Sequence, residues 1–116
     1  MGKEENAIKK GIMATLSILG IKVWNTQSGM VKVKGAYMHL AEKNTSDIIG
    51  YLPYTGRILA IEAKKPDGLP TQGQIEFLAG VNKAHGVGLL VDDIDRFQKI
   101  MQRLIKEDKI KGDKNE

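Results

Sequence analysis

Two apolar runs joined by a four-residue turn constrain the fold of this chain more than any other feature. Residues 47–52 and 57–63 flank Pro53-Tyr54-Thr55-Gly56, which is typical of a turn. Neither run alternates between apolar and polar residues, so we expect both faces of each strand to be buried. A four-residue turn pairs positions whose numbers sum to 109, which places Asp47 opposite Glu62. The sequence therefore predicts a central antiparallel hairpin with two carboxylates facing each other at its open end.

Facing carboxylates are unfavourable in a purely structural sheet. Directly opposed side chains project from the same face with Cβ atoms about 5 Å apart, where two carboxylates repel each other. A divalent cation such as Mg²⁺, which prefers oxygen ligands, removes that repulsion. Lys64 lies two residues beyond Glu62, on the same face and about 6–7 Å further along, within reach of a bound water or a phosphate. Glu-x-Lys is common by chance, and Lys64-Lys65 also suits a solvated strand end, so this hypothesis depends on the register with Asp47.

Length, charge and cysteine content restrict the class of protein. The chain has 116 residues, which suits one compact domain, and no cysteine, which excludes disulfides and thiolate metal sites. No segment resembles a signal peptide or approaches the roughly 20 apolar residues of a membrane span, so we expect a cytoplasmic protein with no membrane partner. The net charge of +4 favours a polyanionic partner, although many basic proteins never bind nucleic acid.

Hydrophobic periodicity predicts further helices and strands around the central hairpin. In chain order we expect a helix at 4–19, a strand at 21–25, a hairpin at 30–34 and 36–40, and then the two central strands. A helix at 71–84, a strand at 87–91 and a last helix follow. Asp92 or Asp93 caps this last helix, whose apolar stripe is Ile94, Phe97, Met101, Leu104 and Ile105. This order, α-β-β-β-β-β-α-β-α, predicts an α/β fold with a mixed sheet flanked by helices. We expect a single domain over residues 1–106 and a charged tail, 107–116, that frays.

Three motifs in this order resemble the VRR-NUC family of PD-(D/E)XK nucleases. They are Asp47-Ile48-Ile49-Gly50, Ile61-Glu62-Ala63-Lys64 and Gln74-Ile75-Glu76-Phe77-Leu78, and Glu5-Asn6-Ala7-Ile8 resembles the family's first helix. The resemblance runs from about residue 5 to residue 91. It implies a restriction-endonuclease-like fold and DNA hydrolysis that depends on Mg²⁺, for which Mn²⁺ is expected to substitute. The chain departs from the pattern in carrying Asn44-Thr45 where many members have a glycine before the Ser-Asp pair, and alanine rather than valine at position 63.

The resemblance also implies roles for individual residues. Asp47 and Glu62 would be metal ligands, helped by the backbone carbonyl of Ala63. Lys64 would position or activate the attacking water, and Gln74 would support the lysine and the waters of the active site. A further position, Glu5, matches the acidic residue of the family's first helix.

Glu5 and Gln74 each have a structural explanation as well. Glu5 lies nearer than Glu4 to the centre of the helix's apolar stripe and so points inward, but an acid there also stabilises a helix N-terminus. Thr71-Gln72-Gly73-Gln74 has the pattern of a capping box, in which Gln74 returns to the N-cap amide. Gln74 nevertheless shares a helix face with Phe77, and its two roles are compatible.

Nucleic-acid contacts are predicted on elements that flank the acidic motif. Lysines and turn amides would supply salt-dependent affinity that is largely independent of DNA sequence. The other explanation is a solvated lysine face on an edge hairpin, which prevents aggregation. The candidates are Gln27, Ser28, Lys32, Lys34 and Lys65.

Other residues that often carry function are discounted here. His39 and His85 have no metal-ligand spacing, and Gly86-Val87-Gly88 does not open a helix as a dinucleotide site requires, so no nucleotide cofactor is expected. Trp24 and Tyr37 suit a core or an interface. Aromatic residues are few, which argues against binding of single strands by base stacking.

These features predict a metal-dependent DNA endonuclease. Members of the resembled family that occur as a lone small domain are similar to Holliday-junction resolvases, which implies branched DNA as the partner. A junction has two symmetric strands to cut, so we expect a homodimer, with the hairpin at 27–40 as its surface. Small nucleases of this kind are frequent in bacteriophage genomes, which suggests the cytoplasm of a bacterial or phage-infected cell. Two alternatives remain: a nuclease for flaps or duplex ends, and a DNA-binding module without turnover.

Overall fold

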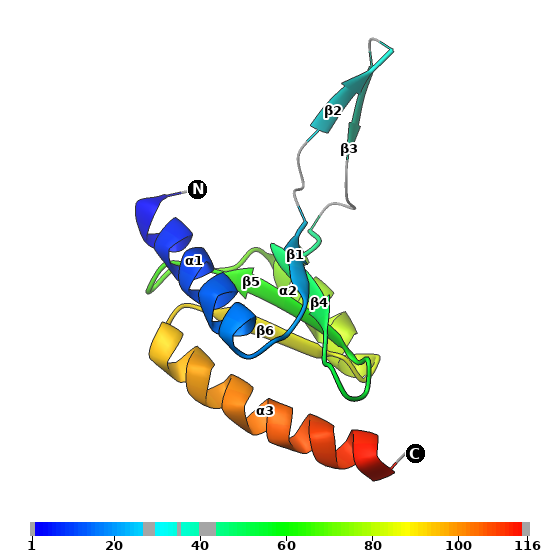
Figure 1. Ribbon diagram of the computed structural model, residues 1–116. Helices are drawn as coiled ribbons and strands as arrows, with labels where there is room; N and C mark the ends of the chain where they lie inside the picture. The colour runs from blue at the N-terminus through cyan, green and yellow to red at the C-terminus, as the bar shows by residue number, and fades with distance from the viewer. Residues whose placement is uncertain (1, 27–29, 35, 40–43, 115–116) are drawn as a thin grey trace.

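The computed structural model describes residues 2–26, 30–34, 36–39 and 44–114. Within them the chain has a mixed α/β fold with three helices, a four-stranded mixed sheet and a separate two-stranded sheet (Figure 1). No helix in this part of the chain is long and apolar enough to cross a membrane. The elements, in chain order, are α1 (Lys3–Ile18), β1 (Val23–Asn25), β2 (Met30–Val33), β3 (Ala36–His39), β4 (Ile48–Tyr51), β5 (Ile58–Ala63), α2 (Gln72–Lys83), β6 (Val87–Val91) and α3 (Ile94–Lys114).

The main sheet has the strand order β1-β4-β5-β6, in which β6 is parallel to β5 and the other pairs are antiparallel. The pairs Ile48↔Ile61 and Gly50↔Leu59 confirm the predicted register of the central hairpin. The turn is closed by hydrogen bonds from Leu52 N–H to Arg57 O and from Gly56 N–H to Leu52 O. The hairpin's open end is therefore where Asp47 and Glu62 meet.

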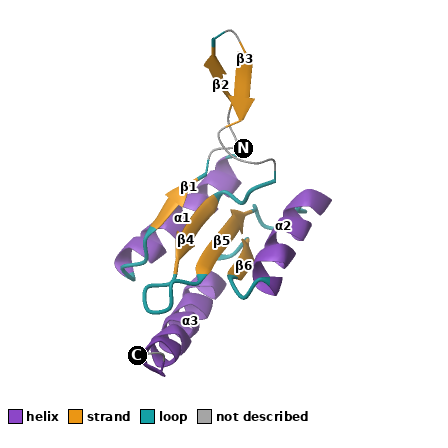
Figure 2. Cartoon of the chain, turned by 90° about the vertical axis from the view of Figure 1, so that its right-hand side faces the viewer, coloured by secondary structure: helices purple, strands orange, loops and turns teal. Residues whose placement is uncertain are grey.

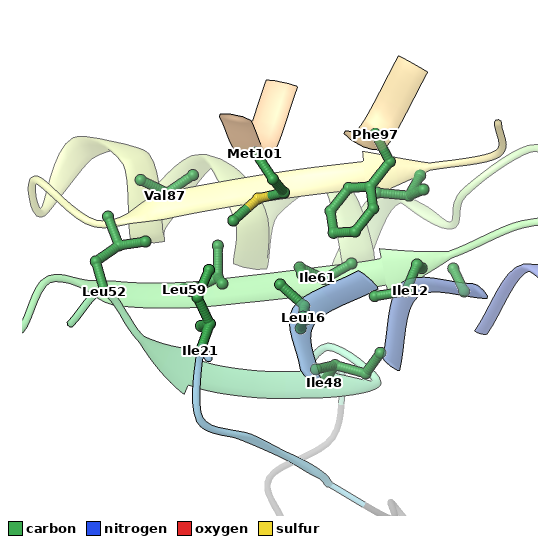
Figure 3. Close-up of a cluster of buried hydrophobic side chains, with 12 residues drawn as sticks. Ile12, Leu16, Ile21, Ile48, Leu52, Leu59, Ile61, Val87, Phe97 and Met101 are labelled. Atoms are coloured by element: carbon green, nitrogen blue, oxygen red, sulfur yellow. The ribbon is translucent and has the colours of Figure 1, made fainter. Parts of the chain in front are cut away.

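Helices cover the main sheet on both faces. Figure 2 shows α2 on one side of the sheet, with α1 and α3 on the other. The hydrophobic core lies on the α1 and α3 side, where Phe97 and Met101 of α3 and Ile12 and Leu16 of α1 pack on the strands (Figure 3). The core residues of β4, β5 and β6 are Ile48, Leu59, Ile61, Ala63, Val87 and Val91, and Leu52 directly after β4 joins them. Asp47, Glu62 and Lys64 alternate with these residues and so belong to the opposite face.

The second face of the sheet is only partly covered. We expected both faces of the central strands to be buried, and for β4 this is wrong, because Tyr51 is 41% exposed. At the start of β5, Ile58 is 47% exposed, and Leu90 of β6 is 44% exposed. For Tyr51 the reason is that α2 packs on β5 and β6 and leaves the β1 side of this face open. Trp24, for which a core or interface position was predicted, is 52% exposed there, so a core position is wrong.

A close backbone approach fixes α2 on the sheet. A Cβ atom at Gly88 would lie 2.6 Å from Leu78 O, so only glycine lets the helix come this near. The side chain of Asn82 then satisfies the outer edge of β6: its Oδ1 accepts from Gly88 N–H at 2.8 Å and its Nδ2 donates to Gly88 O at 3.2 Å. These contacts set the position of the N-terminus of α2, which carries Gln74.

The last helix is longer than the sequence suggested. The prediction that residues 107–116 fray is wrong as far as Lys114, where α3 ends. The cause is Asp108, which is fully buried and accepts hydrogen bonds from Tyr54 N–H at 2.8 Å and from the Thr55 hydroxyl. At the other end of the helix, Asp93 is the cap, since its Oδ1 accepts from Arg96 N–H at 2.9 Å.

The second hairpin stands apart from the main sheet. Among the described strands, β2 and β3 pair only with each other, antiparallel, with Met30 opposite His39 (Figure 1). β2 ends at Val33, one residue before the expected 34, and residue 40, the expected end of the second strand, lies outside the described residues. Lys34 follows β2 with a positive φ of 50° and an exposed side chain. The hairpin therefore contributes nothing to the sheet that carries Asp47 and Glu62.

Candidate active site

Asp47 and Glu62 face each other one position beyond the last registered pair of β4 and β5. The backbone amide of Asp47 donates to Glu62 Oε2 at 3.1 Å. The backbone amide of Ala63 donates to Asp47 Oδ2, also at 3.1 Å. Each carboxylate is thus held by the backbone of the opposite strand, and the predicted juxtaposition is confirmed.

Glu62 is buried although it carries a carboxylate, with 4% of its surface exposed. The pKa of Glu62 is raised from 4.5 to about 7, mainly by burial and next by the negative charge of Asp47. The Asp47 amide and the positive charge of Lys64 act in the opposite direction, and the charge of Glu5 raises the pKa slightly. Near neutral pH this acid is therefore only partly ionised, and a bound cation would favour its charged form.

Gln74 of α2 connects the helix to this pair. Its Nε2 donates to Glu62 Oε1 at 2.7 Å. Its Oε1 accepts from Thr71 N–H at 2.9 Å, while Gln74 N–H donates to the Thr71 side chain at 3.1 Å, which completes a capping box. The two explanations of Gln74 are therefore both correct: one amide group caps α2 and orients the Glu62 carboxylate.

Lys64 lies directly after β5 and reaches across the end of the sheet to α1. Its backbone amide donates to Val91 O at 2.9 Å, which extends the pairing with β6. Its Nζ lies 3.9 Å from Glu5 Oε1, and the two side chains are only 16% and 19% exposed. Glu5 therefore points inward from the first turn of α1, as its helical position predicted, and it directs the lysine. Five predicted residues from four elements meet here.

Two residues that sequence reasoning did not single out hold Asp47 in place. Thr26 N–H donates to Asp47 O at 2.9 Å, and the Thr26 hydroxyl donates to Ser46 O. Ser46 is 1% exposed, and its hydroxyl donates to Ile48 O at 3.2 Å. The sequence signals for Ser46 were its polarity beside an apolar strand and its place in the Ser-Asp pair of the family pattern. Thr26 could be found only from the register of β1 against β4, which the sequence does not reveal because a hairpin separates those two strands in the chain.

The predicted phosphate contacts are not gathered at this site. Lys65 is exposed and adjoins Lys64, so it does border the acidic pair. Lys32 and Lys34 belong to the β2–β3 hairpin, outside the sheet of the acidic pair. Gln27 and Ser28 lie outside the described residues.

The donor set suits a hard divalent cation. Within the described ranges, no group of three or more His, Cys, Asp or Glu side chains is arranged to hold a metal ion. Mg²⁺ needs no such cage, because it commonly binds one or two carboxylates and keeps several waters. The facing carboxylates of Asp47 and Glu62 fit that requirement.

Comparison of the chain with protein-family models, curated proteins and solved structures found no match. The function is therefore inferred from the residues of the site and their geometry.

Proposed function

We propose that this protein is a metal-dependent nuclease that hydrolyses phosphodiester bonds in DNA, with a VRR-NUC-like active site in a restriction-endonuclease-like fold. The observation that carries the proposal is the buried Glu62 carboxylate, which faces the half-buried Asp47 and has Lys64 beside it at one end of the sheet. A mixed sheet with helices on both faces supports the architecture. A fold under selection for stability alone has little reason to bury one acid directly opposite another.

The side chains of the site divide the work between them. Asp47, Glu62 and the carbonyl of Ala63 would hold Mg²⁺, which supplies a Lewis acid that neutralises charge on the phosphate. Gln74 orients the Glu62 carboxylate through its hydrogen bond at 2.7 Å. Lys64, directed by Glu5, places its ammonium group where it orients the attacking water and stabilises the developing negative charge.

DNA is the substrate class that the charge favours. The chain carries a net charge of +4, and Lys65 lies exposed next to the active site. Branched DNA, cut by a homodimer in the manner of a junction resolvase, is the specific substrate we propose. Flapped and blunt duplexes are the competing substrates within the same class.

The decisive experiment measures cleavage of end-labelled four-way junction, flap and blunt duplex DNA with Mg²⁺, with Mn²⁺ and with EDTA. We expect metal-dependent cuts by the wild type and a loss of at least about 10²–10³-fold in Glu62→Ala and in Lys64→Ala. Symmetric nicks in the junction alone would favour a junction resolvase. Cuts confined to flaps would instead identify a flap nuclease of the same class.

Matched controls separate catalysis from charge and folding. Glu76→Ala removes an exposed acid of α2, and Lys99→Ala removes an exposed lysine of α3. Both are expected to cut within about twofold of the wild type, since neither contacts the site. DNA binding without cleavage in either metal by the folded wild type would overturn the nuclease proposal and leave a DNA-binding module.

A further inference from the structure

Two adjoining hollows run along the edge of the molecule between α1 and β1. The first, of about 350 Å³, is lined by Asn6, Lys9, Lys10, Met13 and Asn25. The second, of about 440 Å³, shares Met13 with it and continues to Lys22, Trp24 and Tyr51. Together they form one groove, which we call the α1–β1 groove. Among the residues that the structure describes, three lysines line it and no acidic residue does.

One end of this groove adjoins the active site. Asn6 follows Glu5, whose carboxylate lies 3.9 Å from Lys64 Nζ. On the strand side, Asn25 precedes Thr26, whose amide donates to the backbone carbonyl of Asp47. The lysines of the first hollow therefore begin about one helical turn from the residues that would act on the phosphate.

The other end of the groove lies at the edge strand β1, where Trp24 and Tyr51 line it; their rings belong to the open face of the sheet, opposite α1. Trp24 is 52% exposed and Tyr51 is 41% exposed. Trp24 pairs with Ile49, so Tyr51, two residues further along β4, is its diagonal neighbour on the same face. Such neighbours lie about 7–8 Å apart, within reach of one another for large side chains. Because α2 leaves this part of the sheet open, about half of each of these residues remains exposed in the described part of the chain.

We propose that the α1–β1 groove binds an unpaired DNA strand that leads away from the scissile phosphate. Lys9 and Lys10 contact its phosphates, and Trp24 and Tyr51 stack on its bases. A duplex offers no free base faces, whereas a single strand does, so paired aromatics beside a lysine-lined track fit the unpaired arm of a branched or tailed substrate. The chain has few aromatic residues, which alone argues against base stacking, but two of them lie together at the β1 edge of the groove.

This inference rests on the proposed nuclease function, because the strand in the groove is the strand that enters the active site. It assigns DNA contacts to α1 and β1 rather than to the β2–β3 hairpin. Removing these contacts is expected to weaken binding and raise KM, with kcat little changed, since none of them touches the reacting phosphate.

Trp24 is the single tryptophan of the chain, so its fluorescence reports directly on the groove. The experiment titrates duplexes with a 3′ tail, with a 5′ tail and with blunt ends into the protein in EDTA, where no turnover occurs. We expect tailed DNA to quench the emission of Trp24 and blunt DNA of equal length to leave it nearly unchanged.

Paired variants test the two parts of the groove. Lys9→Ala combined with Lys10→Ala should weaken binding of tailed DNA about tenfold and reduce the slope of log affinity against log salt by about 1.4. Its control, Lys106→Ala with Lys109→Ala, removes two exposed lysines of α3 and should stay within about twofold. Tyr51→Ala should weaken binding at least about fivefold, and Tyr54→Ala, an exposed ring in the β4–β5 turn, should not.

Equal quenching by blunt and tailed DNA, no quenching at all, or equal losses in the two lysine pairs would overturn the proposal. These outcomes are independent of catalysis. If the protein cuts DNA but its Trp24 emission responds equally to tailed and blunt DNA, only the proposal that the groove binds an unpaired strand is contradicted. A protein that binds tails in the groove but never cuts contradicts the nuclease function and supports the groove.

Discussion

A buried acid lies at each end of the central hairpin, and the two acids have opposite surroundings. At the turn, Asp108 of α3 is fully buried and accepts from two donors, Tyr54 N–H and the Thr55 hydroxyl. At the open end, Glu62 also accepts from two donors, but the carboxylate of Asp47 faces it. Burial and that neighbour raise the pKa of Glu62 to about 7.

The difference separates an acid that stabilises the fold from one that costs stability. A buried carboxylate surrounded by donors holds two segments together, as Asp108 holds α3 to the β4–β5 turn. A buried carboxylate opposite another is strained until a cation arrives, and such strain is concentrated at functional sites. The two ends of one hairpin therefore predict opposite responses to substitution.

The largest expected effect on stability is at the turn. Asp108→Ala leaves the Tyr54 amide and the Thr55 hydroxyl without their acceptor, so we expect a loss of about 3 kcal/mol in the free energy of unfolding. Urea denaturation followed by circular dichroism measures it. Asp113→Ala, an exposed acid one and a half turns further along α3, is the control and should change stability by less than about 0.5 kcal/mol. A loss no greater than that of the control would mean that the end of α3 is not anchored by Asp108.

The open end should show the reverse dependence on pH in the absence of metal. Because the folded pKa of Glu62, about 7, lies above its ordinary value of 4.5, its contribution to stability is full below pH 4.5 and is lost as pH rises through 7. The unfolding free energy of the wild type should therefore fall by about 2–3 kcal/mol relative to Glu62→Gln between pH 4.5 and pH 8.

Measuring that difference by urea denaturation in EDTA at several pH values isolates Glu62. The hydrogen bond lost in Glu62→Gln lowers stability by an amount that does not vary with pH. The change in unfolding free energy with pH therefore reports the ionisation of Glu62 alone. Parallel pH profiles for the two proteins would show that Glu62 is not destabilised, and the contrast with Asp108 would disappear.

The central hairpin was predictable because the interactions that define it are local. A four-residue turn determines the register of the strands it joins, so Asp47 opposite Glu62 follows from counting positions. The inward direction of Glu5 follows from helical geometry in the same way. The family assignment from the motifs, and the roles it implies, remain predictions.

The parts that could not be predicted depend on partners distant in the chain. Asp108 lies 54 positions from Tyr54, so residues 107–114 read as a charged tail although an acid among them is the anchor. Thr26 meets Ser46 and Asp47 only because β1 pairs with β4 across an inserted hairpin. The exposure of Tyr51 depends on how far α2 extends over the sheet, which periodicity along β4 does not report.

Gln74 gives the smallest and most discriminating effect, since its side chain serves the fold and the site together. Thr71→Ala removes the cap but leaves the hydrogen bond from Gln74 to Glu62, so it should cost about 1 kcal/mol of stability and little activity. Gln74→Glu preserves the capping pattern but places a third acid against Glu62, so it should retain most of the stability and lose about tenfold or more in cleavage. Urea denaturation and cleavage of the same DNA, measured side by side, separate the two roles. If Thr71→Ala lost as much activity as Gln74→Glu, the capping of α2, rather than the contact with Glu62, would be what the active site requires.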